Sequence, residues 1–298
     1  MAVAATGFFD GVHLGHKKVI DQLCAVARER GEESMLVTFW PHPRSVLQQD
    51  ADRLRLLTTL QEKRARCQAY GVERFEILPF SRSFSELPAE AFIREYLVKR
   101  LGVSTLILGY DHRLGHDRFE SPEQMMECVA RCGVDPVRVE AFSDTAGTTV
   151  VSSTQIRNAL FAGDVVTAER MLGYRYGLHG VVVAGNRIGR TIGFPTANMQ
   201  LYEPLKLVPA NGVYAVRVEV LDRSWQGVCN IGTRPTVGLG GARTIETHIL
   251  DFDQEIYGLD LRIEFCARLR DERRFDSLEL LKEQLALDRQ KAAEIVVA

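Results

Sequence analysis

The 298-residue sequence is long enough for about two domains, and its 46% hydrophobic content is sufficient for two packed cores. A formal net charge of −2 gives no electrostatic sign of nucleic acid binding, and no run of Lys and Arg is long enough for a membrane-binding patch. No apolar run reaches the ~20 residues of a transmembrane helix, and the N-terminus does not read as a secretory signal. We therefore expect a cytoplasmic protein whose partners are small molecules rather than nucleic acids or membranes.

The cysteines are scattered and form no C-x-x-C pair, which indicates reduced, structural thiols. They are Cys24, Cys67, Cys128, Cys132, Cys229 and Cys266.

The first motif, G-F-F-D-G-V-H-L-G-H, runs from Gly7 to His16 and follows a strand-like run of small residues. His13 and His16 are three residues apart, so they share one face on the first turn of a helix. Backbone N–H groups at such a helix start favour phosphate, and imidazoles there can donate to charge on a leaving group. H-x-G-H alone also fits a turn with two ordinary surface histidines. Because the motif starts at Gly7, a short preceding segment is either missing or dispensable.

Strands and helices alternate through the first half of the chain. This order predicts a doubly wound parallel sheet whose ligand site lies at the carboxyl ends of the strands. The F-W-P-H-P segment runs from Phe39 to Pro43, and its prolines end one of these strands in a rigid loop at that edge. The expected strands cover residues 1–6, 34–40, 75–80, 104–109 and 137–142, and the expected helices cover residues 16–31, 59–70, 88–101 and 121–133.

Two further segments carry candidate binding residues, and the first of them falls at the same edge. The loop G-Y-D-H-R-L-G begins at Gly109, where a buried strand ends, and V-S-S-T-Q-I-R ends at Arg157. The hydroxyls of the second segment can cap a helix, and together with Arg157 they form a cluster of phosphate donors, although an ordinary helix cap is the simpler alternative. His112 and His116 have a spacing that suits zinc on a helix, but the loop context and the lack of further ligands argue against a metal site.

Beyond Tyr174 short strands rich in Val, Ile, Thr and aromatic residues dominate, which predicts a small closed antiparallel barrel. The expected domain boundary therefore divides the chain into residues 1–173 and 174–298. A C-terminal helix follows Asp276 and Ser277, either of which can cap it. The expected strands cover residues 181–184, 212–221, 228–231, 244–251 and 261–269.

The barrel contains a glycine-rich segment, G-N-R-I-G-R-T-I-G-F-P-T-A-N, from Gly185 to Asn198. Glycines let a backbone wrap around phosphates, although a simple glycine-rich hairpin would also contain them. Thr196 and Asn198 are two apart in an extended segment, so they point to one side and offer oxygen ligands that suit Mg²⁺. Glu246 opens E-T-H-I-L-D in an alternating strand, where a solvent-facing carboxylate is the simple alternative.

The first motif, F-W-P-H-P, the Gly109 loop and S-S-T-x-x-R resemble the signatures of H-x-G-H nucleotidylyltransferases, in particular prokaryotic bifunctional riboflavin kinase/FAD synthetases. The segments ending in P-T-A-N, N-I-G-T-R-P-T and E-T-H-I resemble those of riboflavin kinases. The resemblance covers nearly the whole chain. His112 and Leu114 stand where the family's loop commonly has phenylalanines, and with Phe8 they bear on how FMN fits.

This resemblance implies a Rossmann-like nucleotidylyltransferase domain followed by a riboflavin kinase barrel. The barrel would phosphorylate riboflavin with MgATP, with Glu246 as general base and Thr196 and Asn198 as metal ligands. The first domain would transfer AMP from a second ATP to FMN, giving FAD and pyrophosphate, with His13, His16 and Arg157 stabilising the phosphates. The implied ATP-binding residues are Gly7, Phe9, Asp10, Gly15, Gly109, Asp111, Ser152, Ser153, Thr154, Gly185, Gly189 and Arg190.

Two alternatives belong to other classes. A nucleotidylyltransferase for another phosphorylated acceptor, such as a phosphorylated pantetheine or nicotinamide, would keep the first motif set but would have no use for P-T-A-N and E-T-H-I. A non-enzymatic flavin-binding regulator would keep the barrel but would not need Thr196, Asn198 and Glu246 together.

Overall fold

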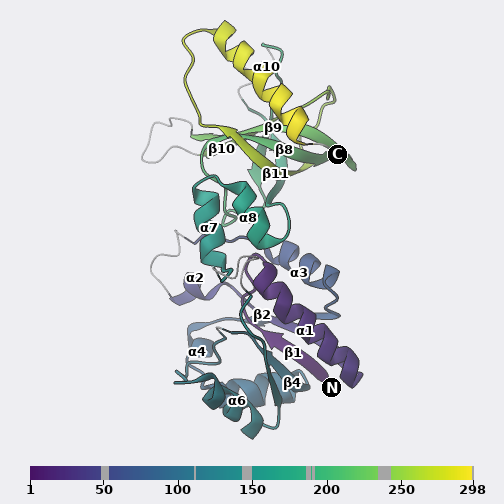
Figure 1. Cartoon of the computed structure of the whole chain (residues 1–298), viewed down its shortest axis with the longest axis vertical. Coiled ribbons are helices and arrows are strands. Elements are labelled where there is room, and N and C mark those ends of the chain that lie inside the picture. The colour runs from purple at the N-terminus through teal and green to yellow at the C-terminus, as the bar shows by residue number, and fades with distance from the viewer. Residues whose placement is uncertain are drawn as a thin grey trace. The chain divides into compact units, whose positions relative to one another are not determined.

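The computed structural model describes residues 1–47, 54–110, 112–142, 150–185, 189, 192–233 and 243–296. The chain forms two compact units, Met1–Ser153 and Thr154–Ala298. The first is built on a parallel sheet and the second on an antiparallel barrel (Figure 1). The expected domain boundary between residues 173 and 174 stays a prediction.

A five-stranded parallel sheet forms the centre of the first unit, in the order β3-β2-β1-β4-β5. Because all strands are parallel, their carboxyl ends meet at one edge. The strand order reverses at β1, which is where open α/β sheets bind ligands. The strands are β1 (Ala2–Thr6), β2 (Glu33–Trp40), β3 (Arg74–Pro79), β4 (Val103–Leu108) and β5 (Asp135–Arg138).

Helices cover both faces of this sheet, as the predicted doubly wound fold requires. Val3 and Ala5 of β1 belong to the core under α1 and α3, whereas Ala2 and Ala4 belong to the core under η2 and α6. This alternation follows from the period of two along a strand. The helices are α1 (Leu14–Arg30), α2 (Pro43–Leu47), α3 (Leu60–Ala69), α4 (Arg82–Ser85), α5 (Ala89–Ala91), η2 (Phe92–Arg100) and α6 (Pro122–Arg131).

Two expected elements of the first unit differ from the structure. The helix expected at 88–101 is a single turn, α5, continued by the π-helix η2, in which the N–H of Leu101 donates to Tyr96 O at 3.1 Å, five residues back. This winding lets Phe92 and Leu97 both reach the core. β5 ends at Arg138 rather than at residue 142, because its partner β4 ends at Leu108.

Six strands of the second unit close into an antiparallel barrel in the order β10-β7-β6-β11-β8-β9, with β9 paired back onto β10. The predicted barrel and C-terminal helix are confirmed, and β7 is a strand where only an extended segment was expected. The elements are α7 (Ser153–Phe161), α8 (Val165–Leu172), β6 (Gly177–Val183), β7 (Ala197–Leu201), β8 (Gly212–Val220), β9 (Arg223–Thr233), β10 (Arg243–Ile249), β11 (Asp260–Arg270) and α10 (Leu278–Ile295).

The structure agrees with two expectations from composition. All six cysteines are unpaired thiols. Among the described residues, no helix combines the length and the apolar character needed to cross a lipid bilayer.

A buried ion pair holds α10 on the barrel. Arg270 Nη2 lies 2.8 Å from Asp288 Oδ2, and Arg270 Nε lies 3.1 Å from Oδ1. Gln284 donates to the same carboxylate at 2.7 Å. Because the Asp288 side chain is only 1% exposed, its removal would leave a guanidinium without its counter-ion in a poorly hydrated place.

We therefore expect Asp288→Asn to lower the free energy of unfolding of the second unit by about 3 kcal/mol, measured by urea denaturation. Glu219→Gln is the matched control. Its carboxylate lies 3.9 Å from Arg262, and both side chains are about half exposed, so its loss should cost less than about 1 kcal/mol. Equal losses from the two variants would contradict a special role for the buried pair.

Candidate active sites

The turn between β1 and α1 is strained. Phe9 and Val12 have φ angles of +47° and +38°, a left-handed conformation that is rare for non-glycine residues and most of all for a β-branched one. Both side chains are buried in the core. The Asp10 carboxylate accepts hydrogen bonds at 3.0–3.1 Å from the backbone N–H groups of Leu57 and Thr58. These contacts hold the turn in its conformation.

His13 and His16 stack face to face at the start of α1. Their ring centroids are 3.7 Å apart and their planes differ by 20°. His13 is the N-cap of the helix, and its Nδ1 accepts from the backbone N–H of His16 at 3.3 Å, which leaves Nε2 as the donor of a neutral ring. Gly15 makes room for this pair, because a Cβ at that position would lie 3.1 Å from the His13 ring.

The environment of His16 disfavours its charged form. Burial lowers the pKa of His16 well below its usual value of 6.5, and positive charge on His13 and Lys63 lowers it further. Its Nδ1 is buried and has no hydrogen-bond partner in the described part of the chain. His16 therefore offers this site a neutral hydrogen-bonding ring rather than a positive charge.

Other predicted residues of the first motif have structural contacts. The N–H of Gly7 donates to Val37 O at 3.0 Å, and the Phe9 ring packs edge-on against His16, with centroids 5.1 Å apart. The hydroxyl of Ser153 donates to the carbonyl of Asp10 at 2.9 Å, which brings Ser153 together with this turn. The ATP-binding roles of these residues stay predictions.

The remaining residues of V-S-S-T-Q-I-R are divided between the units. Ser152 lies beside Ser153 in the first unit, whereas Thr154 and Arg157 belong to the second and lie on α7. The role of Arg157 as a phosphate clamp stays a prediction.

The loop that follows β4 contributes one residue to the carboxyl edge of the sheet and another to the hydrophobic core. Gly109 directly follows the strand, and His112 Nε2 lies 3.0 Å from Thr6 Oγ1 at the carboxyl end of β1. Leu114 is fully buried in the core and contacts apolar side chains there. Asp111 lies outside the described residues. Within the described residues, no group of three or more His, Cys, Asp or Glu side chains is placed to hold a metal ion.

Aromatic rings gather near the carboxyl ends of β1, β2 and β3. The Phe8 ring lies 4.4 Å from the His42 ring and 5.8 Å from the Phe39 ring. Phe39 in turn lies 6.2 Å from Phe80 and 5.7 Å from Phe84. This aromatic group can pack against a planar heterocycle. The sequence marked F-W-P-H-P only as a rigid loop, because the group assembles from separate strands.

In the barrel, three polar residues stand in one row across three strands. Glu246 of β10 is paired with Asn198 of β7 on one side and with Asn230 of β9 on the other. Residues directly opposed on antiparallel strands point to the same face with Cβ atoms ~5 Å apart. The row therefore joins the motifs P-T-A-N, E-T-H-I and N-I-G-T-R-P-T. The last three residues of the third motif, 234–236, lie outside the described part of the chain.

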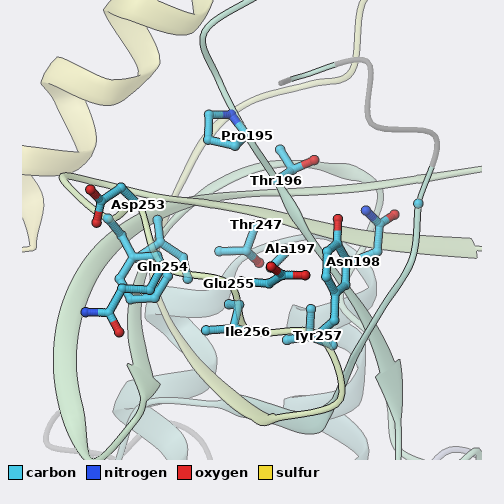
Figure 2. A pocket seen from close by; sticks show the side chains of 14 residues that line it. Pro195, Thr196, Ala197, Asn198, Thr247, Asp253, Gln254, Glu255, Ile256 and Tyr257 are labelled. Atoms are coloured by element: carbon cyan, nitrogen blue, oxygen red, sulfur yellow. The ribbon is translucent and has the colours of Figure 1, made fainter. Parts of the chain in front are cut away.

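A pocket of about 370 Å³ opens beside Asn198. Gly185, Thr196 and Asn198 line it together with the segment Phe252–Tyr257, which the sequence analysis missed. Figure 2 shows Thr196 and Asn198 on one side of the pocket and Asp253 on the other. The volume is within the range of small-molecule sites. The signal in the sequence was a polar segment directly after E-T-H-I-L-D.

Two glycines allow close approaches in this region. A Cβ on Gly185 would lie 2.2 Å from Asn198 Nδ2, so the glycine leaves a cradle for the amide. A Cβ on Gly189 would lie 2.2 Å from Phe194 O, and the N–H of Phe194 donates to Gly189 O at 2.8 Å. Arg190 lies outside the described residues.

His248 connects the two barrel motifs and was also missed. Its Nδ1 lies 2.8 Å from Pro195 O, next to Thr196, and its ring lies 5.4 Å from that of Phe194. Burial lowers the pKa of His248, and the bond to Pro195 opposes this shift. The sequence feature that could have identified His248 is its spacing of two residues from Glu246, which places both side chains on one face of the strand.

Comparisons with known proteins match both units. A family model described as FAD synthetase matches residues 1–155, and one described as riboflavin kinase matches residues 172–296. The bifunctional riboflavin kinase/FMN adenylyltransferase of Bacillus subtilis (strain 168) is 38% identical over 294 residues, which cover 98% of this chain and 91% of that protein. The chain belongs to this bifunctional family. The protein of the same name from Escherichia coli (strain K12) is 38% identical, with 98% of this chain and 92% of that protein covered.

A solved structure confirms the fold of both parts. A crystal structure from Streptococcus pneumoniae, described as that of a macrolide-efflux protein, has a TM-score of 0.90 and 31% identity to this chain. The likeness covers 98% of this chain and 93% of that one. The resemblance inferred from the motifs is thus confirmed over nearly the full length.

The lowered pKa of His16 predicts how the free energy of unfolding of the first unit depends on pH. Because His16 stays neutral in the folded state while an unfolded imidazole binds a proton near pH 6.5, wild-type stability is fully present above that pH and is lost as the pH falls below it. Relative to His16→Gln, the free energy of unfolding of the first unit should fall by at most about 1.4 kcal/mol per pH unit below 6.5. Urea denaturation between pH 7.5 and 5.5 measures this difference.

The control is His116→Gln, since His116 is an exposed histidine in the same unit. This variant should keep the pH dependence of the wild type. A difference between wild type and His16→Gln that does not change with pH would contradict the effect of burial on His16.

Proposed function

We propose that the chain makes FMN and FAD at two separate sites, the histidine pair of the first unit and the polar row of the barrel. The observation that carries the proposal is the assembly of Asn198, Glu246 and Asn230 in one row, while His13 and His16 stack in another unit. This arrangement supports the assignment of a separate site to each motif set. A regulator would need neither set, and a nucleotidylyltransferase for another acceptor would not need the row.

In the first unit, a phosphate oxygen of FMN attacks the α-phosphate of ATP, and pyrophosphate leaves without a covalent enzyme intermediate. His13 Nε2 and the ring of His16 donate hydrogen bonds to charge on the transferring and leaving phosphates. The aromatic group packs against the isoalloxazine ring, with His112 at its border. The start of α1 at Gly15 and the hydroxyls of Ser152 and Ser153 surround the triphosphate.

In the barrel, Glu246 takes the proton of the ribityl 5′-hydroxyl, and the oxygen attacks the γ-phosphate of ATP to give FMN and ADP. We place this ATP in the pocket beside Asn198, with Gly185, Gly189 and Arg190 around its phosphates.

Mg²⁺ would be held by the hydroxyl of Thr196 and the amide oxygen of Asn198. The donor set fits a hard cation, because these are neutral oxygen donors with acidic Glu246, Asp253 and Glu255 nearby, and Gly185 leaves the Asn198 amide unobstructed. Bound there, the ion neutralises phosphate charge. The bond from His248 to Pro195 positions Thr196 for this role.

We further propose that the protein is located in the cytoplasm. Reduced thiols and phosphorylated small-molecule substrates suit the cytoplasm.

Variants of the two acting groups should separate the activities. His16→Ala should lower FAD formation from supplied FMN by about 100-fold or more while sparing FMN formation. Glu246→Gln should lower FMN formation by about 100-fold or more while sparing FAD formation from FMN. Chromatography of flavins after incubation with ATP, Mg²⁺ and riboflavin or FMN measures both. Loss of both activities in either folded variant would refute the two-site assignment.

Glycine variants test the packing of the same sites. Gly15→Ala places a methyl group 3.1 Å from the His13 ring, and Gly185→Ala places one 2.2 Å from Asn198 Nδ2. Each should impair its own reaction, FAD formation for the first and FMN formation for the second, and each variant's other reaction is its internal control. Unchanged rates in both variants would show that neither glycine is needed for room at its site.

A further inference from the structure

We propose that Lys63 binds a phosphate group of the substrates during FMN adenylylation, a role that rests on the proposed placement of this reaction at His13 and His16.

Lys63 is a buried cation that forms no ion pair with any described residue. It is 5% exposed, and no hydrogen bond or ion pair of its ammonium group occurs within the described part of the chain. Its Nζ lies 5.8 Å from the centre of the Phe8 ring. By contrast, the half-exposed Lys17 pairs with Asp21 at 2.7 Å. Because an unpaired buried charge is unfavourable, the fold alone gives no reason for a lysine here.

The position of Lys63 is fixed relative to the histidine site. It lies on the first turn of α3, which starts with a complete capping box between Thr59 and Glu62. Just before this helix, the hydroxyl of Thr58 accepts from the N–H of Gly11 at 3.0 Å. The start of α3 is thus tied to the turn that carries His13.

The residues around Lys63 do not provide an anion that pairs with its ammonium group. Burial lowers the pKa of the Lys63 ammonium, and the Asp10 carboxylate opposes this shift. That carboxylate already accepts from two backbone N–H groups and lies beyond ion-pair distance. The ammonium also lowers the pKa of His16, so Lys63 stands close to the neutral imidazole. A bound phosphate would provide the missing counter-charge.

Adenylyl transfer needs such a cation. A new bond forms between the FMN phosphate oxygen and the α-phosphorus, and the bond from that phosphorus to the bridging oxygen breaks, so that pyrophosphate leaves with the electron pair. Both reactants are anions, and a fixed ammonium offsets their repulsion while keeping its own protons. Lys63 lies beside the Phe8 ring of the aromatic group, and its charge acts on His16 of the histidine pair. The phosphate is therefore that of FMN or one of those of ATP.

The test uses the full chain with Lys63→Met, which keeps the length of the side chain and removes its charge. Initial rates of FAD formation from supplied FMN give KM for FMN and for ATP separately. We expect one of them to rise by about 10- to 100-fold, the effect of losing one charge-assisted hydrogen bond. A rise for FMN assigns the acceptor phosphate, and a rise for ATP assigns the triphosphate. Lys63→Arg, which restores a charge, should recover part of the affinity.

Two controls separate this role from a structural one. Arg64→Gln removes an exposed charge from the next residue of α3 and should leave both KM values unchanged. The Tm of Lys63→Met should be unchanged or raised, because an uncompensated buried charge is removed. Unchanged KM values for both substrates, or a lowered Tm with a loss of kcat alone, would overturn the proposal. If His16→Ala also left FAD formation intact, the placement of the site would fail instead.

Discussion

The hydrogen bonds of the Asp10 carboxylate are the interaction on which the amino-terminal site depends. They hold the strained turn of Phe9 and Val12 against the segment Leu57–Thr58, which leads directly into α3. The same turn ends in His13, whose ring caps α1 and stacks on His16. One buried acidic side chain thus fixes two helix starts relative to each other. Charge-assisted bonds to backbone N–H groups are strong enough to support such strain.

The barrel site depends on strand register in the same way. Glu246 faces Asn198 and Asn230 only because β10 is paired in one particular register with β7 and β9. A slip of one residue would turn Glu246 to the other face and replace it with Thr247. Closure of the barrel pins β10 on both edges and so excludes the slip. The bond from His248 to Pro195 adds a side-chain contact that fixes the same register.

Helix starts depend on contacts within a few residues and are therefore readable from local sequence. The helix expected from residue 59 begins with a capping box of Thr59 and Glu62, and of the two candidate caps Asp276 and Ser277 the structure uses Ser277. The sheet and barrel also followed from local periodicity. The π-helical winding of η2 and the end of β5 did not, because core packing and the length of a partner strand decide them.

The candidate sites were predictable as motifs but not as assemblies. E-T-H-I and P-T-A-N were recognisable, yet their adjacency is a matter of long-range register. Lys63 was missed for a related reason. In a polar helix sequence a lysine is expected at the surface, and only tertiary packing shows that this one is buried.

The distribution of charge in the first unit explains why the site combines stacked histidines with a separate cation. Two imidazolium rings whose centroids are 3.7 Å apart would repel each other strongly away from water. A neutral His16 ring avoids this repulsion and can still donate a hydrogen bond to an oxyanion, but it adds no charge to balance that of the proposed phosphorylated substrates. A lysine is the better source of that charge, because its intrinsic pKa is far higher than that of an imidazole. In the proposed reaction the histidines would therefore supply direction and the ammonium would supply charge, and the lowered pKa of His16 favours the stacked pair.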